Sequence, residues 1–321
     1  MVLRAGLLWL SEQPYVFRFL RSNRLARQLA SRFVAGETIE SAVTAVQDLN
    51  AAGISATLDV LGESVTNVEE ARAARDAYLR ALDRLAEARA GANVSLKLTQ
   101  MGIDVDERMC VDNVCAVVAR AKALGSFARI DMEGSDYTQR TLDLFKRHLH
   151  PEFGDGVGVV LQSYLRRTKR DLADLLALGA RVRLCKGAYK EKADVAFPDK
   201  RDVDANYVTC MEELLERGNR PAIATHDATI IAHARTFARK RDIPPARYEF
   251  QMLYGVRRDL QLALRRQGYR VRVYVPFGDE WYPYLMRRLA ERPANIGFLL
   301  GSVVRESLQR RDGRAKTERG A

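Results

Sequence analysis

Short runs of β-branched residues alternate with longer helical stretches from residue 56 onward. Apolar residues fall at every second position in the short runs and at every third or fourth position in the longer ones. The strand-like runs cover residues 56–63, 92–99, 127–133, 156–163, 181–188, 221–227, 248–253 and 271–278. Strict alternation of strands and helices predicts parallel strands joined by right-handed crossovers.

Capping residues mark the ends of several helices. The sequence Thr66-x-x-Glu69 predicts a capping box after the first strand. Four glycines are expected just past helix ends, namely Gly125, Gly179, Gly218 and Gly268. Eight repeats over residues 56–292 match the size of a (β/α)8 barrel of about 250 residues. We therefore predict an α/β fold, a (β/α)8 TIM-type barrel, with an open doubly wound sheet as the alternative.

The pattern divides the chain into three parts. Residues 1–50 are predicted to form an N-terminal helical arm, with short amphipathic helices over residues 6–29. Residues 51–304 form the predicted barrel, and its final helix is expected to cap the barrel mouth. Residues 305–321 form a basic tail that we expect to be disordered.

The net charge of +11 is concentrated at the two ends of the chain. Residues 1–30 hold five arginines against one glutamate, and residues 305–321 hold six basic against three acidic residues. No stripe of basic and aromatic residues runs along one face, so we do not expect a nucleic-acid-binding module. The arm is expected to pack outside the barrel, and attraction of the ends to an anionic membrane is the alternative.

The four cysteines form no C-x-x-C pair and show no metal-ligand spacing, which is typical of a reducing compartment. No run approaches the roughly 20 apolar residues of a membrane span. The apolar stretch at residues 6–10 is shorter than the roughly 7–15 residues of a signal-peptide core. We expect a cytoplasmic protein, with peripheral membrane association as the closest contact with a bilayer.

Several predicted strands are apolar on one face and polar or charged on the other. The polar faces carry Ser95, Lys97 and Thr99, then Arg129, Asp131 and Glu133, then Arg272 and Tyr274. Because the apolar face must meet the helices, the charged face is expected to point into the barrel. Buried charges are costly unless they are paired or bind a charged ligand. An internal ion-pair network and a ligand site both satisfy this pattern.

Polar side chains cluster near the C-terminal strand ends, where barrel enzymes place their active sites. The predicted ring contains Lys97, Asp131, Gln162, Arg183, Lys186, His226, Gln251, Leu253 and Tyr274. It holds no Ser–His–Asp set and no carboxylate cluster for a metal, and it suits an anionic substrate with an organic cofactor. On the last helix, Arg287 and Arg288 with Glu291 suggest a carboxylate clamp, and a solvated helix face is the alternative.

The motifs at these strand ends resemble those of the proline dehydrogenase family, the flavin enzymes that oxidise L-proline to Δ1-pyrroline-5-carboxylate. They are LKLTQMG at 96–102, IDME at 130–133, LQSY at 161–164, RLCKGAY at 183–189, ATHD at 224–227, FQMLYG at 250–255, YVPFG at 274–278 and YLMRRLAE at 284–291. The length, without a second catalytic domain, resembles the monofunctional bacterial form.

The resemblance implies FAD in the barrel mouth, hydride transfer from C5 of proline to FAD, and a membrane quinone as electron acceptor. It assigns catalytic roles to Asp131 and Arg183. The implied cofactor-binding residues are Met132, Gln162, Arg183, Lys186, Gly187, Ala188, Thr225 and His226. The implied substrate-binding residues are Lys97, Arg287, Arg288, Tyr274, Leu253, Ala188, Tyr189 and Glu291.

Two other interpretations of individual motifs remain. A Schiff-base aldolase on the same barrel would need a strand-borne lysine with a depressed pKa, and Lys97 and Lys186 are both candidates. The glycines at 154, 156 and 158 loosely resemble a dinucleotide fingerprint, but they precede a strand instead of following one. We interpret that segment as a turn.

Overall fold

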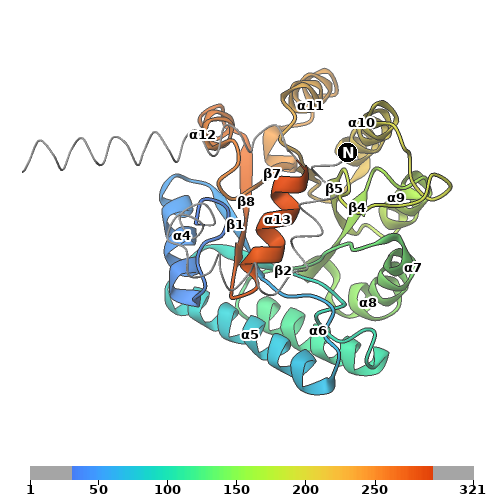
Figure 1. Cartoon of the computed structure of the whole chain (residues 1–321). Helices are drawn as coiled ribbons and strands as arrows, with labels where there is room; N and C mark the ends of the chain where they lie inside the picture. Colours follow the sequence, from blue (N-terminus) through green and yellow to red (C-terminus); the bar gives the residue numbers. More distant parts are fainter. Residues whose placement is uncertain (1–30, 292–321) are drawn as a thin grey trace, which may run out of the picture.

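Eight parallel strands close into a barrel, and helices surround it. The computed structural model describes residues 31–291, with side chains as far as Met286. Within this part the strands pair in chain order, from β1 round to β8 and back to β1. Figure 1 shows the helices outside the ring of strands and α13 lying across one end of it. The predicted (β/α)8 barrel is confirmed, and the open sheet is excluded.

The strands are β1 Ser55–Val60, β2 Ala92–Leu96, β3 Ala128–Ile130, β4 Val157–Gln162, β5 Arg181–Cys185, β6 Ala222–Ala224, β7 Glu249–Leu253 and β8 Arg270–Phe277. The helices are α4 Ile39–Ala51, α5 Val68–Glu87, α6 Glu107–Ala123, α7 Ser135–Leu144, α8 His150–Phe153, α9 Thr168–Ala177, α10 Lys200–Arg217, α11 Ala228–Lys240, α12 Arg258–Arg266 and α13 Trp281–Glu291. A π-helical turn, Phe145–Leu149, joins α7 to α8, and short 3-10 turns cover Gly154–Gly156 and Pro245–Arg247. Residues 154–156 thus form a turn, as predicted, whereas Val157 and Gly158 of the same glycine-rich segment belong to β4.

Most strands are shorter than the sequence pattern predicts. The run at 92–99 gives a strand that ends at Leu96, and the run at 181–188 gives one that ends at Cys185. Beyond β2 the backbone turns, since the Lys97 carbonyl accepts a hydrogen bond from Met101 N (3.2 Å). Beyond β5 the chain stays bonded to the segment after β4, since the Lys186 carbonyl accepts from Tyr164 N (2.9 Å). Polar and apolar residues still alternate in the segments after β2 and β5, because these segments also face the barrel mouth.

Two of the predicted helix caps are wrong in detail. The cap of α5 is Asn67, whose side chain accepts from Glu70 N (2.9 Å), while the Glu70 carboxylate accepts from Thr66 N (2.8 Å). The box is therefore one residue later than predicted. Gly218 is extended (φ −75°) and does not lie in the left-handed region. The other three glycines have φ between +68° and +85° just past their helices, as predicted.

The two faces of the strands differ as the sequence pattern predicts. Leu58, Leu96, Ile130 and Val273 are fully buried beneath the helices, in the main hydrophobic core. The buried polar side chains come mostly from the alternate positions, including Thr57, Asp59, Asn93, Ser95, Arg129, Arg183, Glu249 and Gln251. The barrel interior is therefore polar, and its contacts decide what the site can do.

Helix α13 covers the end of the barrel at which the strands terminate. It follows β8 after a turn in which Gly278 (φ +125°) donates its N–H to the Gly36 carbonyl (3.0 Å). Its buried residues Trp281, Tyr282, Tyr284, Leu285 and Met286 pack with Val34 and Leu61. The predicted capping of the mouth by the last helix is confirmed.

The predicted arm helices over 6–29 and the basic tail at 305–321 lie outside the described residues, so the three-part division of the chain stays a prediction. Within residues 31–291, none of the helices has the length and apolar character that crossing a bilayer requires. The four cysteines are free thiols. The described residues also contain no group of His, Cys, Asp or Glu side chains that could hold a metal ion.

Candidate active site

Lys97 and Asp59 form a buried ion pair at the mouth. Asp59 lies in β1 and Lys97 directly follows β2, which places the lysine Nζ 3.2 Å from Asp59 Oδ1. The carboxylate is 1% exposed and the lysine side chain 13% exposed. Burial alone would lower the pKa of Lys97, but the carboxylates of Asp59 and Asp131 raise it above its ordinary value. Lys97 therefore stays protonated at neutral pH.

Asp131 accepts three hydrogen bonds from three other strands. Arg183 Nη1 in β5 donates to Oδ1 (2.8 Å), Ser95 Oγ in β2 donates to the same oxygen (2.7 Å), and the Tyr274 hydroxyl in β8 donates to Oδ2 (2.7 Å). The guanidinium of Arg183 also lies 5.3 Å from the Tyr274 ring centroid. Burial raises the pKa of Tyr274, so its hydroxyl keeps its proton and remains a donor. These bonds fix the orientation of Arg183 and Tyr274 together.

Arg183 and Gln162 have polar atoms that no described residue satisfies. Nε and Nη2 of Arg183 and Oε1 of Gln162 are buried without a hydrogen-bond partner in the described part of the chain. Gln162 Nε2 donates to the Met132 carbonyl (3.1 Å), which orients the free oxygen. Leaving buried polar atoms unpaired costs about 1–3 kcal/mol each. Two neighbouring strands therefore present unsatisfied polar groups.

Lys186 lies just past β5 between two carboxylates. Its Nζ is 2.5 Å from Asp204 in α10 and 3.2 Å from Asp227, the N-cap residue of α11. Burial opposes ionisation of Asp204, but Lys186 and Lys200 outweigh it and lower the pKa of that carboxyl. A hollow of about 540 Å³ adjoins this group, and Asp204 and Asp227 both line it.

The loop after β5 depends on Gly187. This residue has φ +102°, and a Cβ there would lie 2.2 Å from Cδ1 of the Tyr164 ring. Glu191, further along the loop, accepts hydrogen bonds from Ser135 N (2.8 Å) and Ser135 Oγ (2.5 Å). The loop is thus held against the start of α7, with Ala188 and Tyr189 exposed beside the mouth.

Thr225 and His226 follow β6 and bind the neighbouring backbone. His226 Nε2 accepts a hydrogen bond from Leu253 N (2.9 Å), so the imidazole is neutral in this arrangement and carries its proton on Nδ1. Thr225 Oγ1 accepts one from Asp227 N (3.1 Å). Both residues shape the ends of β6 and β7.

Most of the predicted ring converges, with one difference. Lys97, Asp131, Arg183 and Tyr274 form one connected network through Asp59 and Asp131, and Lys186 lies beside it with its own carboxylates. Gln251 donates instead to Glu249 Oε1 (2.6 Å), deeper in the barrel. Arg287, Arg288 and Glu291 lie in α13 over the mouth, but their side chains lie outside the described part, so the clamp stays a prediction.

Sequence reasoning missed Asp59 and Asp204 as partners of site residues, and it missed Glu191, which holds the loop after β5. The inward position of Asp59 could have been predicted, because Thr57 and Asp59 alternate with apolar Ala56, Leu58 and Val60 in the first strand. Asp204 and Glu191 lie in helix α10 and in a loop, where no alternation marks an inward position. Only the fold shows that they meet Lys186 and Ser135.

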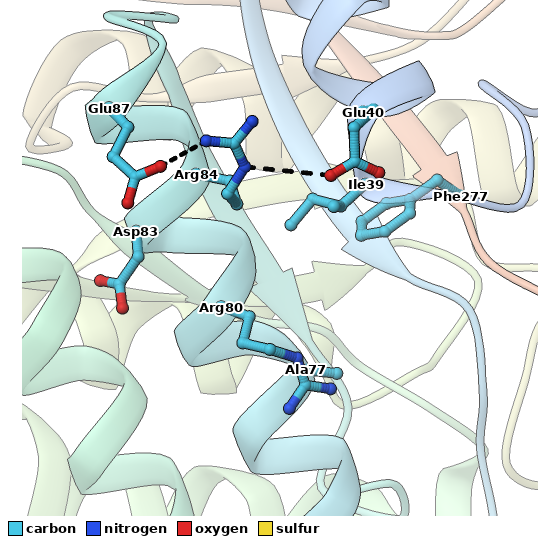
Figure 2. Close-up of a pocket in the computed structure, with 8 residues that line it drawn as sticks. All are labelled: Ile39, Glu40, Ala77, Arg80, Asp83, Arg84, Glu87 and Phe277. Carbon is cyan, nitrogen blue, oxygen red and sulfur yellow. Dashed lines mark hydrogen bonds and ion pairs between the residues drawn. The ribbon is translucent and has the colours of Figure 1, made fainter.

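A separate hollow lies outside the barrel. It measures about 450 Å³ and lies between α4 and α5, lined by Ile39, Glu40, Ala77, Arg80, Asp83, Arg84, Glu87 and Phe277. Figure 2 shows Arg84 forming ion pairs with both Glu40 and Glu87 there. Its central arginine is thus already neutralised within the hollow. The connected charged network lies at the strand ends instead.

A closed (β/α)8 barrel with protonated Lys97, an oriented Arg183 and unsatisfied polar atoms at its strand ends defines a barrel enzyme whose site suits an organic anion. The sequence profile described as proline dehydrogenase matches residues 42–300. Proline dehydrogenase 1 of Bacillus subtilis (strain 168) is 41% identical over 305 residues, which cover 95% of this chain and 100% of the relative. Proline dehydrogenase of Deinococcus radiodurans is 42% identical over 310 residues, which cover 94% of this chain and 98% of that protein.

A solved structure of proline utilization A (PutA) from Bdellovibrio bacteriovorus, inactivated by N-propargylglycine, has the same fold with a TM-score of 0.79 at 28% identity. It is matched over 86% of this chain and 34% of the PutA chain, so this chain spans about a third of that protein. The chain belongs to the proline dehydrogenase family, a generally flavin-dependent family that oxidises proline to Δ1-pyrroline-5-carboxylate.

Proposed function

We propose that the chain binds FAD in the barrel mouth and oxidises L-proline at C5, with a membrane quinone as the final electron acceptor. The observation that carries the proposal is the group of unsatisfied buried atoms on Arg183 and Gln162, next to the network centred on Asp131. A flavin ring offers an N–H donor together with carbonyl and nitrogen acceptors along one edge. It would satisfy the two guanidinium nitrogens and the amide oxygen together.

The surrounding residues also fit FAD. The loop after β5 is held in place where Gly187 packs against the Tyr164 ring, and Lys186 beside it is the cation that we propose for a phosphate. The hollow next to Asp204 and Asp227 gives room for an extended ligand. Met132, Ala188, Thr225 and His226 are assigned to the rest of the cofactor by the family resemblance.

Proline would be held through its carboxylate by Lys97, Arg287 and Arg288. The raised pKa of Lys97 keeps that charge available, and each charge-assisted hydrogen bond contributes about 1.5–3 kcal/mol. Glu291 is proposed to orient the two arginines. The walls of the pyrrolidine site would come from Tyr274, Leu253, Ala188 and Tyr189, which limit the space round the ring.

Bound FAD would accept the hydride equivalent that leaves C5. The role of the chain is to hold proline with C5 facing that acceptor, which lowers the entropic part of the barrier. Arg183 keeps a fixed positive charge where electrons arrive, and Asp131 holds it in place through the 2.8 Å contact. These two are the proposed catalytic residues.

The aldolase alternative is less consistent with the geometry. A Schiff-base lysine must lose its proton, whereas the ion pair with Asp59 raises the pKa of Lys97. Lys186 is held between two carboxylates. Borohydride trapping with a keto acid tests this directly, because a covalent lysine adduct would support the aldolase.

The experiment that tests the proposal is a visible spectrum of the purified protein, followed by anaerobic addition of L-proline. We expect flavin bands that bleach with proline. A flavin spectrum that ignores proline would contradict the substrate assignment, and no chromophore after adding FAD would contradict the cofactor.

The quinone step is tested separately. The basic segments 1–30 and 305–321 are proposed to aid docking on an anionic membrane. Removing both should weaken binding to vesicles that contain anionic lipid while leaving proline-dependent flavin bleaching unchanged. Equal vesicle binding with and without the segments would refute this role.

A further inference from the structure

A second charged cluster lies deeper in the barrel, below the residues assigned to proline and FAD. It contains Arg129 in β3, Arg181 at the start of β5, Arg272 in β8 and Glu249 at the start of β7. Arg129 is 1% exposed and is the largest fully buried side chain described. The proposed reaction uses none of these four residues, yet burying several guanidinium groups together is costly.

Arg129 has no carboxylate within 4 Å among the residues that the structure describes. Its Nη1 donates to the backbone carbonyls of Arg181 (3.0 Å) and Val159 (3.4 Å). Its Nε, also buried, finds no partner in the described part. Gly158 makes room for it, since a Cβ there would lie 2.9 Å from Arg129 Nη1. The charge of Arg129 is therefore solvated by carbonyl dipoles and is not neutralised.

Glu249 is the carboxylate of this cluster, and it forms an ion pair with Arg272. Arg272 Nε lies 2.9 Å from Glu249 Oε1, and Gln251 donates to the same oxygen. Burial opposes ionisation of Glu249, but Arg272, Gln251 and Arg129 outweigh it and lower its pKa to about 2. Arg270 Nη2 also lies 3.9 Å from Glu249 Oε2, at the more exposed edge. Four guanidinium groups thus surround one ionised carboxylate, and the base of the barrel keeps an excess of positive charge.

This charge lies close beneath the proposed cofactor site. Arg129 in β3 lies two residues before Asp131, and Arg181 lies two residues before Arg183 in β5, which is about 7 Å of extended chain in each case. Burial lowers the pKa of Arg129, and repulsion from Arg183 and Arg181 lowers it further. A guanidinium group nevertheless keeps its proton in proteins, so Arg129 stays charged. Because the intervening space is filled with protein, salt screens this field only weakly.

We propose that Arg129 tunes the reaction from a distance: its unneutralised charge raises the electrostatic potential at the barrel mouth and so favours the more negative, reduced flavin. Arg129 touches neither substrate nor cofactor, so it is not a catalytic residue. It acts through the field that it adds to that of Arg183. The inference rests on the proposed binding of FAD.

The test is the midpoint reduction potential of the flavin in the holoenzyme, measured by redox titration with reference dyes. Arg129→Gln removes the charge and is expected to shift the potential to more negative values. Arg129→Lys keeps the charge and is expected to stay near the unmodified protein. Glu249→Gln removes the opposing charge and is expected to shift the potential to more positive values.

Arg129→Gln and Glu249→Gln should shift the flavin potential in opposite directions if the effect is electrostatic. Loosened packing would not make the sign of the shift follow the sign of the charge that was removed. A wild-type potential in Arg129→Gln, or shifts of the same sign in both variants, would overturn the inference. If Arg129→Gln does not fold, Glu249→Gln decides alone, and an unchanged or more negative potential overturns it. A wild-type protein that binds no flavin would contradict the proposed function instead.

Discussion

The ammonium group of Lys97 lies 3.2 Å from the carboxylate of Asp59, a side chain that is 1% exposed. The Tyr78 hydroxyl, buried behind them, donates to the Ser95 carbonyl (2.8 Å) and lies 3.4 Å from Asp59. The cation that is proposed to meet the substrate is therefore positioned before any substrate arrives. The Lys97 side chain therefore loses little conformational entropy when the substrate binds.

Asp59→Asn should lower kcat/KM for proline by about 10- to 100-fold, because it leaves Lys97 buried without its counter-charge. Asp59 raises the pKa of Lys97, so the variant lysine should lose its proton at a lower pH than in the unmodified protein. KM should therefore begin to rise at a lower pH as the solution is made alkaline. Asp83→Asn, which breaks the partly exposed ion pair between Asp83 and Arg120 outside the barrel, is the control and should leave the profile unchanged. Identical pH profiles in Asp59→Asn and the unmodified protein would contradict the assignment.

Tyr274→Phe removes one of the three hydrogen bonds that Asp131 accepts. A hydrogen bond to a charged group contributes about 1.5–3 kcal/mol, so we expect kcat/KM to fall by at least about tenfold. Since burial raises the pKa of Tyr274, the unmodified enzyme should show no loss of activity from tyrosine ionisation up to pH 10. Tyr269→Phe, whose hydroxyl accepts from Arg235 away from the site, is the matched control. Equal steady-state kinetics for the two variants would speak against the network.

Glu249 should make stability depend on pH. Its folded pKa of about 2 lies below its ordinary value of 4.5, so its contribution is present above pH 4.5 and is lost as the pH falls towards 2. The shift corresponds to about 3 kcal/mol at pH 7. Urea unfolding should show that Glu249→Gln is less stable by about this amount at pH 7, and that the gap narrows below pH 4.5. A gap that stays constant down to pH 3.5 would disprove the linkage.

Gly187→Ala should destabilise the loop after β5 and reduce the flavin bound per protein. The new methyl group would meet both a left-handed backbone (φ +102°) and the Tyr164 ring at 2.2 Å. Gly125→Ala is the matched control, since its φ is also positive (+68°) but nothing lies within 4 Å of an added Cβ. The control should lose only about 1 kcal/mol of stability. Comparable flavin content and melting temperature in the two variants would show that the close approach at Gly187 is unimportant.

Arg287→Met and Arg288→Met should raise KM for proline by orders of magnitude while flavin content stays the same. The reason is the loss of a charged contact to the substrate carboxylate, made from a helix that lies over the mouth. Arg266→Met, on exposed α12, controls for the removal of an arginine elsewhere on the surface. Steady-state kinetics that match this control in both clamp variants would refute the carboxylate assignment.

The barrel and its polar interior could be predicted because alternation is a local property of each strand. The sequence shows that Arg129 and Asp131 lie on one face of the third strand-like run. Because helices must cover the apolar face of that run, the sequence also predicts that Arg129 and Asp131 point into the barrel. The order of the strands followed from the strict alternation of elements.

The partners within the site could not be predicted, because they depend on which strands and helices meet. Nothing local says that Tyr274 donates to Asp131, 143 residues away. The prediction of the α5 cap was wrong for a different reason. The sequence contains two possible capping boxes one residue apart, Thr66-x-x-Glu69 and Asn67-x-x-Glu70. The structure uses the second, in which Glu70 reaches back to Thr66 N.

Both ends of the described chain meet at the barrel mouth, where Val34 packs with Trp281 and Ala35 N donates to the Pro276 carbonyl (2.8 Å). The turn between α9 and β5 lies at the opposite end, with Leu178 42% exposed. A thiol introduced there by Leu178→Cys would tether the protein to an electrode with its mouth towards the solution. Tethering near Val34 or α13 would press the mouth against the support, so the point of attachment alone would decide whether substrate can enter.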